Sequence, residues 1–309
     1  MNKFGIDIYL PCVDKNIFVQ ELSFSDYGNI IKFTQNKDYK NLNRYFDYIL
    51  KKNSEGVNID SLNRIDKTVI LTMLRSLCVS PDLSLTFKSD KIKRDYNKKI
   101  ELSNIINKLS DFDWNHKKMV NIDDNISLEL TLPRSLYISD VNTIIDECFY
   151  KIIINENEFD LYDLSREEMI EFLEFLPSNI VPEIIEYIKE TKNIHDDIVF
   201  FNHKDPFDEN AIEHEYKFNI YDNTLFEFLM VLYTDNLKNH YQYNYILSSQ
   251  CKIDTNYLQT CTPAEVNLYF KLFEEEWARK EQQQKNQQNS NKSGLNLPVP
   301  KTWLNKTPN

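Results

Sequence analysis

The residues with the clearest capacity for chemistry are three histidines set among acidic residues. His195, His203 and His214 lie in "IHDDIVFFNHKDPFDENAIEHEY", residues 194–216. Metal sites need such side chains at close spacing on rigid elements, as with two histidines four residues apart on a helix. The spacings here are eight and eleven residues, and "DPFDEN" lacks the glycine of a calcium loop. A solvated acidic loop is therefore favoured, and a metal-dependent hydrolase built from distant residues around His203 and Asp205 is the weaker alternative.

Other catalytic or cofactor sites find little support in the sequence. The five cysteines are scattered without a C-x-x-C pair: Cys12, Cys78, Cys148, Cys251 and Cys261. This spacing favours reduced thiols over a disulfide framework or a zinc site. The four glycines are isolated, whereas phosphate-binding loops need closely spaced glycines, and there is no G-x-S-x-G elbow. We therefore expect a non-enzymatic protein with no catalytic residues, no cofactor, no metal and no small-molecule substrate.

The charge balance narrows the class of partner. The chain has 309 residues with 48 acidic and 36 basic side chains, a net charge of -12 at pH 7. Such a field repels phosphate backbones and anionic lipids, and no segment approaches the roughly 20 apolar residues that cross a bilayer. We expect protein partners, without nucleic acid or membrane, and a protein that stays where it is made.

The beginning of the chain has the pattern of a β-hairpin followed by a helix. The β-rich runs "DIYLP" and "NIFVQELS" flank "CVDK", whose aspartate and lysine suit a turn. Ser25 is expected to cap the helix that follows, because its hydroxyl can accept a free N–H of the first turn.

Amphipathic segments fill much of the remaining chain. Residues 38–52 and 61–78 place apolar side chains at three- and four-residue spacing, which predicts helices with one buried face. Short β-rich runs such as "DLSLTF" and "NISLELTLP" lie between helical segments. The pattern predicts an α+β fold of small antiparallel sheets or hairpins with amphipathic helices.

Two helix starts are specific. Ser165 stands three residues before Glu168, and Thr262 three residues before Glu265. Each pair is a capping box, in which each side chain binds the backbone N–H of the other residue. The second box begins the longest predicted helix, whose apolar stripe ends at Trp277.

We predict three parts: an N-terminal domain of hairpin and helices (1–112), an α+β domain ending in the long helix (113–280), and a disordered polar tail (281–309). The tail ends in a short peptide with prolines, Trp303 and Leu304. This peptide is too short to form its own core, so two interpretations stay open. It packs back onto its own domain, or it docks into a partner protein.

The order of the segments resembles the baseplate proteins of T-even-type contractile-tailed phages, in particular the hub assembly protein family. The similar segments run to about residue 280 and are "LSFSDYGNIIKF", "DKTVILTMLRSLCVSPDLSLTF", "LPRSLYISDV", "SREEMIEFLEFLPSNIVPEIIEYI" and "CTPAEVNLYFKLFEEEWARKE". The polar tail with "PKTWLN" departs from that family's pattern.

The resemblance implies a non-enzymatic protein of the infected host's cytoplasm, which helps to build the hub of the tail baseplate as an assembly chaperone or remains in the virion as a structural subunit. Its partners would be other phage tail and baseplate hub proteins. A cytosolic protein-binding adaptor unrelated to phages is the alternative. Ile17 and Val19, as part of a strand edge, and Trp303 and Leu304 are the expected partner-binding residues.

Overall fold

The computed structural model describes residues 4–114, 116–139, 147–155, 157–161, 164–194 and 198–293. The strands are β1 (Gly5–Leu10), β2 (Lys15–Gln20), β3 (Ser54–Glu55), β4 (Asp82–Lys88), β5 (Asp95–Glu101), β6 (Lys118–Asn121), β7 (Ile126–Leu130), β8 (Phe149–Ile154), β9 (Asn157–Asp160), β10 (Ile198–His203) and β11 (His214–Phe218). The helices are α1 (Phe24–Gln35), α2 (Tyr39–Asn53), η1 (Ile59–Ser61), α3 (Arg64–Cys78), α4 (Leu102–Asp111), α6 (Arg166–Phe175), α7 (Ile180–Ile194), α8 (Thr224–Leu232), α9 (Leu237–Ser249), α10 (Thr255–Thr260) and α11 (Pro263–Ser293). The predicted α+β class is confirmed.

The predicted N-terminal hairpin is present and forms part of a small sheet. Strands β1 and β2 pair antiparallel, and the short β3 pairs with the other side of β2. The register sets Ile8 opposite Ile17, and both side chains are buried together with Leu10 and Val19. The alternating apolar residues of the hairpin therefore build the core, because successive strand side chains point to opposite faces.

The cap of α1 differs from the sequence expectation. Ser23, not Ser25, is the N-cap, and its Oγ accepts the N–H of Asp26 at 3.2 Å. The N–H of Phe24 donates to the carbonyl of Cys261 at 2.6 Å, a contact with a distant part of the chain. This contact helps to fix the start of the helix at Phe24. Because it joins residues far apart in the sequence, the local pattern around Ser23 and Ser25 could not predict it.

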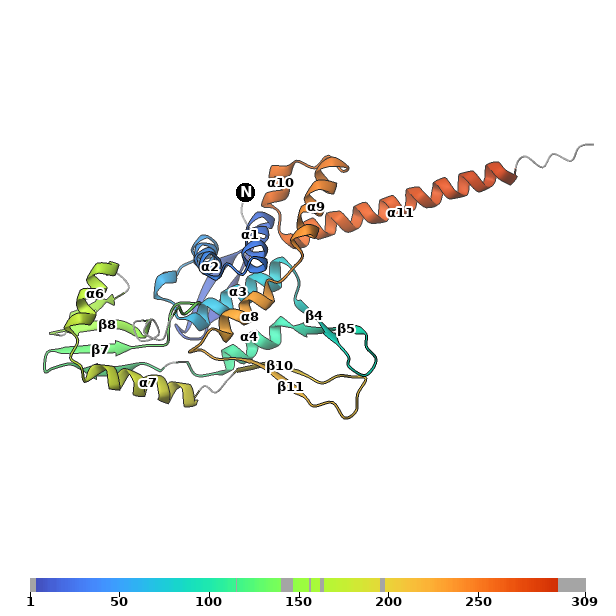
Figure 1. The fold of residues 1–309 in the computed structure, drawn as a ribbon. Coiled ribbons are helices and arrows are strands. Elements are labelled where there is room, and N and C mark those ends of the chain that lie inside the picture. The colour runs from blue at the N-terminus through green and yellow to red at the C-terminus, as the bar shows by residue number, and fades with distance from the viewer. Residues whose placement is uncertain are drawn as a thin grey trace, which may run out of the picture.

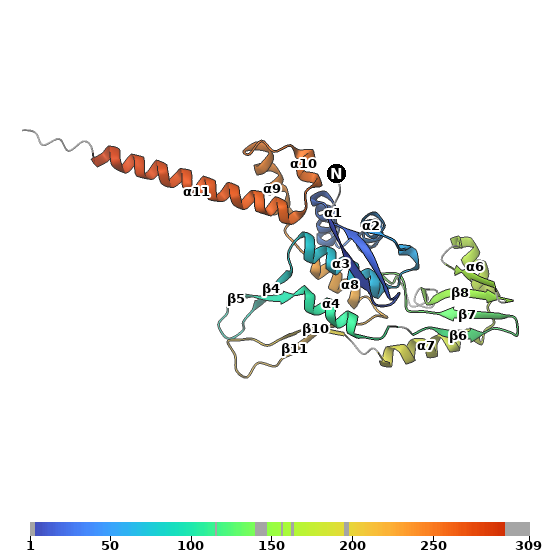
Figure 2. The ribbon, with the colours of Figure 1, turned by 180° about the vertical axis from the view of Figure 1, so that it is seen from behind.

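Both predicted capping boxes are confirmed. The N–H of Ser165 donates to Glu168 and the N–H of Glu168 to Ser165 Oγ, at 2.7 and 3.3 Å. Thr262 and Glu265 repeat this exchange at 2.8 and 3.2 Å. The second box opens α11, which continues beyond Trp277 to Ser293 and leaves the body of the molecule (Figures 1 and 2). The expected long C-terminal helix is thus confirmed, and residues 294–309 lie outside the described part.

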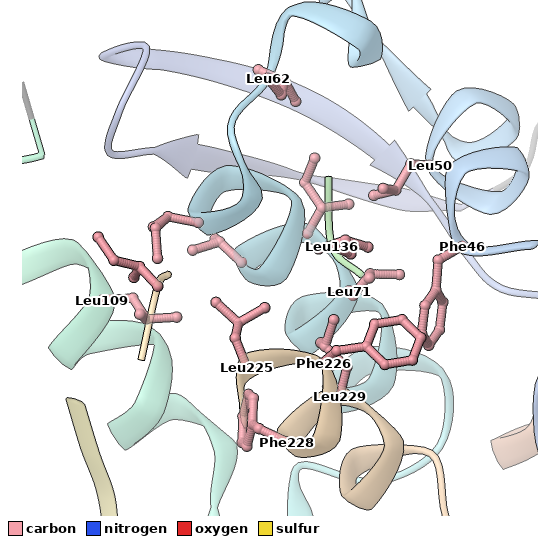
Figure 3. Close-up of a cluster of buried hydrophobic side chains, with 14 of the residues drawn as sticks. Phe46, Leu50, Leu62, Leu71, Leu109, Leu136, Leu225, Phe226, Phe228 and Leu229 are labelled. Atoms are coloured by element: carbon pink, nitrogen blue, oxygen red, sulfur yellow. The ribbon is translucent and has the colours of Figure 1, made fainter. Parts of the chain in front are cut away.

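Helix α3 lies at the centre of the molecule. It packs against β1, α2, α4 and α8, and Figure 3 shows Leu71 of α3 near Phe46 of α2 and near Phe226 and Leu229 of α8. Ring centroids of Phe46 and Phe226 are 6.1 Å apart. One buried cluster contains residues from Ile8 to Tyr233, so it includes residues on both sides of the predicted domain boundary at residue 112. The division into domains stays a prediction.

The first residue of α3, Arg64, is fully buried. Its Nη1 donates to the carbonyl of Ile220 at 2.8 Å and its Nη2 to the carbonyl of Leu136 at 2.6 Å. Its backbone N–H donates to the carbonyl of Pro133 at 2.8 Å. Burial lowers the pKa of the guanidinium to about 10, so the group stays charged at neutral pH and needs these acceptors.

The periphery consists of two sheet regions. One is a four-stranded antiparallel sheet in the order β6-β7-β8-β9, with α7 against β6. The other is an arm of two hairpins, β4–β5 and β10–β11, that lie side by side (Figure 1). Phe87 of β4 stacks on His203 of β10 with ring centroids 3.8 Å apart, so aromatic packing joins the two hairpins.

Helices α9, α10 and α11 dock on α1 through a second, smaller cluster. Phe24, Leu247, Leu258, Cys261 and Val266 are its buried members. His240 of α9 stacks on Phe24 with centroids 3.8 Å apart. A Cβ at Gly28 of α1 would lie 2.4 Å from Nε2 of His240, so a side chain larger than hydrogen cannot be placed there without moving the ring.

Replacing the buried guanidinium tests its role. We expect Arg64→Leu to lower the free energy of unfolding by about 3 kcal/mol or more, because two buried carbonyls lose their donors. Urea unfolding followed by circular dichroism measures the change. Arg44→Leu, at an exposed position of α2, is the matched control and should alter stability by less than about 0.5 kcal/mol. Equal effects of the two substitutions would contradict the assignment.

The close approach of α1 and α9 predicts whether a substitution at Gly28 stabilises or destabilises the protein. Gly28→Ala should destabilise the protein by about 1–3 kcal/mol, because the new methyl group overlaps the His240 ring. In an unobstructed helix the same change stabilises by up to about 1 kcal/mol. Thermal unfolding of Gly28→Ala, His240→Ala and the double variant gives the answer. In the His240→Ala background the added methyl should cease to destabilise, and a persistent loss would refute the steric explanation.

Candidate functional site at the turn of the first hairpin

The structure places two of the expected partner-binding residues in the core. Ile17 is 2% exposed and Val19 0%, and their strand β2 lies between β1 and β3. Neither side chain is at the surface, because both point from the sheet toward the helices. Trp303 and Leu304 lie outside the described residues. A partner-binding role for the four residues stays a prediction.

The turn of the same hairpin borders a groove of about 650 Å³. We call it the hairpin groove. Its walls come from the turn, η1 and the residue before α3, the end of α4, and the sheet that contains β7 and β8. The lining residues are Tyr9, Pro11, Cys12, Val13, Asp14, Ser61, Asn63, Ser110, Phe112, Asp113, Trp114, Lys117, Thr131 and Tyr150.

Local polar contacts fix the shape of the turn. Asp14 has a positive φ of 47°, a conformation that aspartate tolerates better than most residues. Its Oδ1 accepts the hydroxyl of Tyr9 at 2.9 Å. The N–H of Cys12 donates to Oδ1 of Asp66 at 3.0 Å. The turn is therefore attached to the first turn of α3, and Tyr9 and Val13 remain exposed.

Burial controls the titration of the groups beneath the turn. Burial raises the pKa of Asp66 to about 6, while bonds from Cys12 and Val13 oppose the shift. Burial and the neighbouring Asp66 carboxyl raise the pKa of the Cys12 thiol well above its ordinary value. Because a thiolate is the reactive form, Cys12 has the environment of an inert structural cysteine.

The opposite wall combines aromatic and charged side chains. The rings of Phe112 and Trp114 are 5.4 Å apart. Lys117 lies 2.6 Å from the Glu129 carboxylate, and its Nζ is 4.7 Å from the ring centre of Tyr150. A groove with exposed apolar side chains and charges of both signs is suited to a protein segment, because aromatic anchors and a polar rim are typical of protein interfaces.

Sequence reasoning identified the hairpin but missed the groove. Its aromatic residues occur at positions 9, 112, 114 and 150, far apart in the chain and without a shared motif. The only local signal was the turn-like "CVDK" segment beside Tyr9.

The histidine-rich segment has a packing role in the arm. Nε2 of His203 lies 2.7 Å from the hydroxyl of Tyr96, and the His203 ring stacks on Phe87. Burial lowers the pKa of His203, with Lys98 as a second cause. Asp205 accepts the N–H of Phe207 at 2.9 Å. Among the residues that the structure describes, no group of three or more His, Cys, Asp or Glu side chains could hold a metal ion; His195 lies outside them.

The described helices were also compared with the length and hydropathy that a membrane span requires. Within residues 4–293, apart from the short gaps already given, none is both long and apolar enough to cross a bilayer.

Comparison with known proteins identifies one family. Residues 1–217 match the family model described as "T4 bacteriophage base plate protein". The match ends close to the end of β11, so α8–α11 lie beyond it, whereas the sequence resemblance was expected to run to about residue 280. No curated protein and no solved structure matches the chain.

The titration of Asp66 gives a pH-dependent prediction. Because its pKa is raised from 3.8 to about 6, folding favours the protonated carboxyl. The penalty is absent below the unfolded pKa, grows as pH rises, and is complete above the folded pKa. Between about pH 4 and pH 7.5, Asp66→Asn should therefore gain about 2–3 kcal/mol of stability relative to the unsubstituted chain.

Urea unfolding at both pH values measures this difference. Asp90→Asn serves as the control for the loss of a surface carboxylate, because the Asp90 side chain lies almost fully in solvent. A pH-independent difference between Asp66→Asn and the unsubstituted chain would show that the Asp66 carboxyl is not shifted by burial.

Proposed function

The chain belongs to the T4 bacteriophage base plate protein family, and on that premise we propose that it is a non-enzymatic assembly factor or minor subunit of the baseplate hub. The observation that carries the proposal is the family match over residues 1–217. The matched region includes the N-terminal sheet, both hairpins of the arm and the four-stranded sheet. Other phage tail proteins are the proposed partners, in the host cytoplasm during assembly and, if the chain is a minor subunit, also in the baseplate of the virion.

The hairpin groove supports this proposal as a place for a partner segment. The groove has a volume of about 650 Å³ and is lined by residues from several separate parts of the chain. Tyr9 and Val13 are exposed at the hairpin turn and line the groove, which gives the groove an apolar border. Such residues gain most from burial when a partner excludes water around them.

The charge of the groove favours a partner with polar contacts at the rim. Asp14 and Asp113 line the groove together with Lys117. These charged groups at the edge affect which partner binds and how fast, more than how tightly it binds. A loop of a tail protein with an apolar centre and charged flanks would match this arrangement.

Quantitative mass spectrometry of gradient-purified phage particles and of hub intermediates tests the function. A fixed small copy number in particles would make the chain a minor hub subunit. Presence in hub intermediates but not in particles would make it an assembly factor. Absence from both fractions would reject the proposal in favour of a role outside the baseplate.

A substitution in the groove tests how the partner is bound. Val13→Arg should reduce the amount of the chain in particles or hub intermediates by at least about tenfold, because a guanidinium replaces an apolar contact at the groove. Val181→Arg on α7 is the matched control, since Val13 and Val181 are both 41% exposed. Circular dichroism should show that both variants fold. Equal recovery of the two variants would exclude the hairpin groove as the binding site.

A further inference from the structure

A second groove lies where α11 leaves the body of the molecule. Its volume is about 550 Å³, and its walls include Ile246 and Gln250 of α9 and Phe270, Phe273 and Trp277 of α11. Tyr243 of α9 begins the row of aromatic rings, with its centroid 4.3 Å from that of Phe270. We call this site the α9–α11 groove. It belongs to the part of the chain beyond the family match.

The aromatic wall of this groove is partly exposed to solvent. Trp277 is 53% exposed, although its ring is 5.9 Å from that of Phe273 and its Nε1 donates to Glu281 at 3.1 Å. Beyond this point α11 continues to Ser293 with polar residues, and Figures 1 and 2 show it projecting away from the other elements. An apolar segment that covered Trp277 would remove a large aromatic surface from water.

We propose that the chain's own C-terminal segment, residues 295–304, turns back along α11 and places its end, residues 299–304, in the α9–α11 groove, with Trp303 against Trp277. This segment is "LNLPVPKTWL". Val299, Trp303 and Leu304 lie far enough along the chain from Ser293 to reach the groove, and they supply the apolar surface that it lacks. Its two prolines favour an extended backbone, which suits a groove between two helices.

The length of the chain permits this contact. Trp277 precedes Ser293 by sixteen residues, which corresponds to about 24 Å along the helix at about 1.5 Å per residue. Trp303 follows Ser293 by ten residues, which reach about 33 Å when extended at about 3.3 Å per residue. The segment can therefore turn back along α11 and still bring Trp303 to Trp277.

The charges of segment and groove are complementary. Glu274 and Glu281 line the groove, whereas the segment and the residues after it carry Lys301 and Lys306 and no acidic residue. Attachment to the same chain raises the effective concentration of the segment to about the millimolar range. Weak contacts are therefore sufficient to hold it, and a second molecule must compete with it for the groove.

Limited trypsin digestion of the full chain tests the proposal. The measured quantity is the rate of cleavage after Lys301, followed by mass spectrometry and compared with the free peptide 294–309. Docking should make the full chain at least about tenfold slower than the peptide, because cleavage requires the open state. Trp277→Ala and Trp303→Ala should each restore a rate close to that of the peptide.

Leu272→Ala is the matched control. Leu272 has the same 53% exposure as Trp277 but lies five residues earlier, about 140° away around the helix. Its replacement should change the cleavage rate by less than about twofold. The proposal is overturned if the full chain is cleaved as fast as the peptide, or if Leu272→Ala acts like Trp277→Ala.

The same digestion at two protein concentrations distinguishes this occupant from a second copy of the chain. Protection by the chain's own segment should be equal at about 1 μM and about 100 μM, because an intramolecular contact does not depend on concentration. Protection that disappears on dilution would assign the groove to a second copy and overturn the proposal.

Discussion

The buried guanidinium of Arg64 is the constraint on which the arrangement of the elements depends. It binds the carbonyls of Leu136 and Ile220, one in the segment that follows β7 and the other in the connection between β11 and α8. A charged group without solvent must keep its acceptors, because an unpaired buried charge costs several kcal/mol. The N-terminus of α3 thus sets where the chain passes on its way to α8, and apolar packing around Leu71 and Phe226 then fills the centre.

The same helix end also connects the core to the hairpin groove. Asn63 caps α3 through the N–H groups of Ile65 and Asp66 and lines the groove. Asp66, two residues after Arg64, accepts the N–H of Cys12 in the hairpin turn. The first turn of α3 therefore binds two backbone carbonyls of the core through Arg64. Beside it, Asn63 lines the hairpin groove, and Asp66 binds the turn that borders it. A partner in the groove would therefore contact a surface whose shape depends on the first turn of α3.

The C-terminal helices are held on α1 by the close packing of the His240 ring. His240 fills the space above Gly28 and stacks on Phe24, and burial lowers the pKa of His240 to about 4, so the ring is neutral where it packs. This contact helps to fix α9 on α1, and α9 in turn forms one wall of the α9–α11 groove. The family match ends before these helices, and they carry an aromatic surface that differs from the hairpin groove in both place and composition.

Local patterns in the sequence determined the α+β class, the first hairpin, both capping boxes and the long helix from Pro263, because hydrophobic period and capping act between residues a few positions apart. Tertiary structure alone decided that Ser23 caps α1, that Ile17 and Val19 are core residues, and that Tyr9, Trp114 and Tyr150 border one groove. These outcomes depend on contacts between distant segments, such as Phe24 with Cys261. No local period encodes such contacts, so the sequence predicted the elements, whereas their packing determined which surfaces remain free to bind.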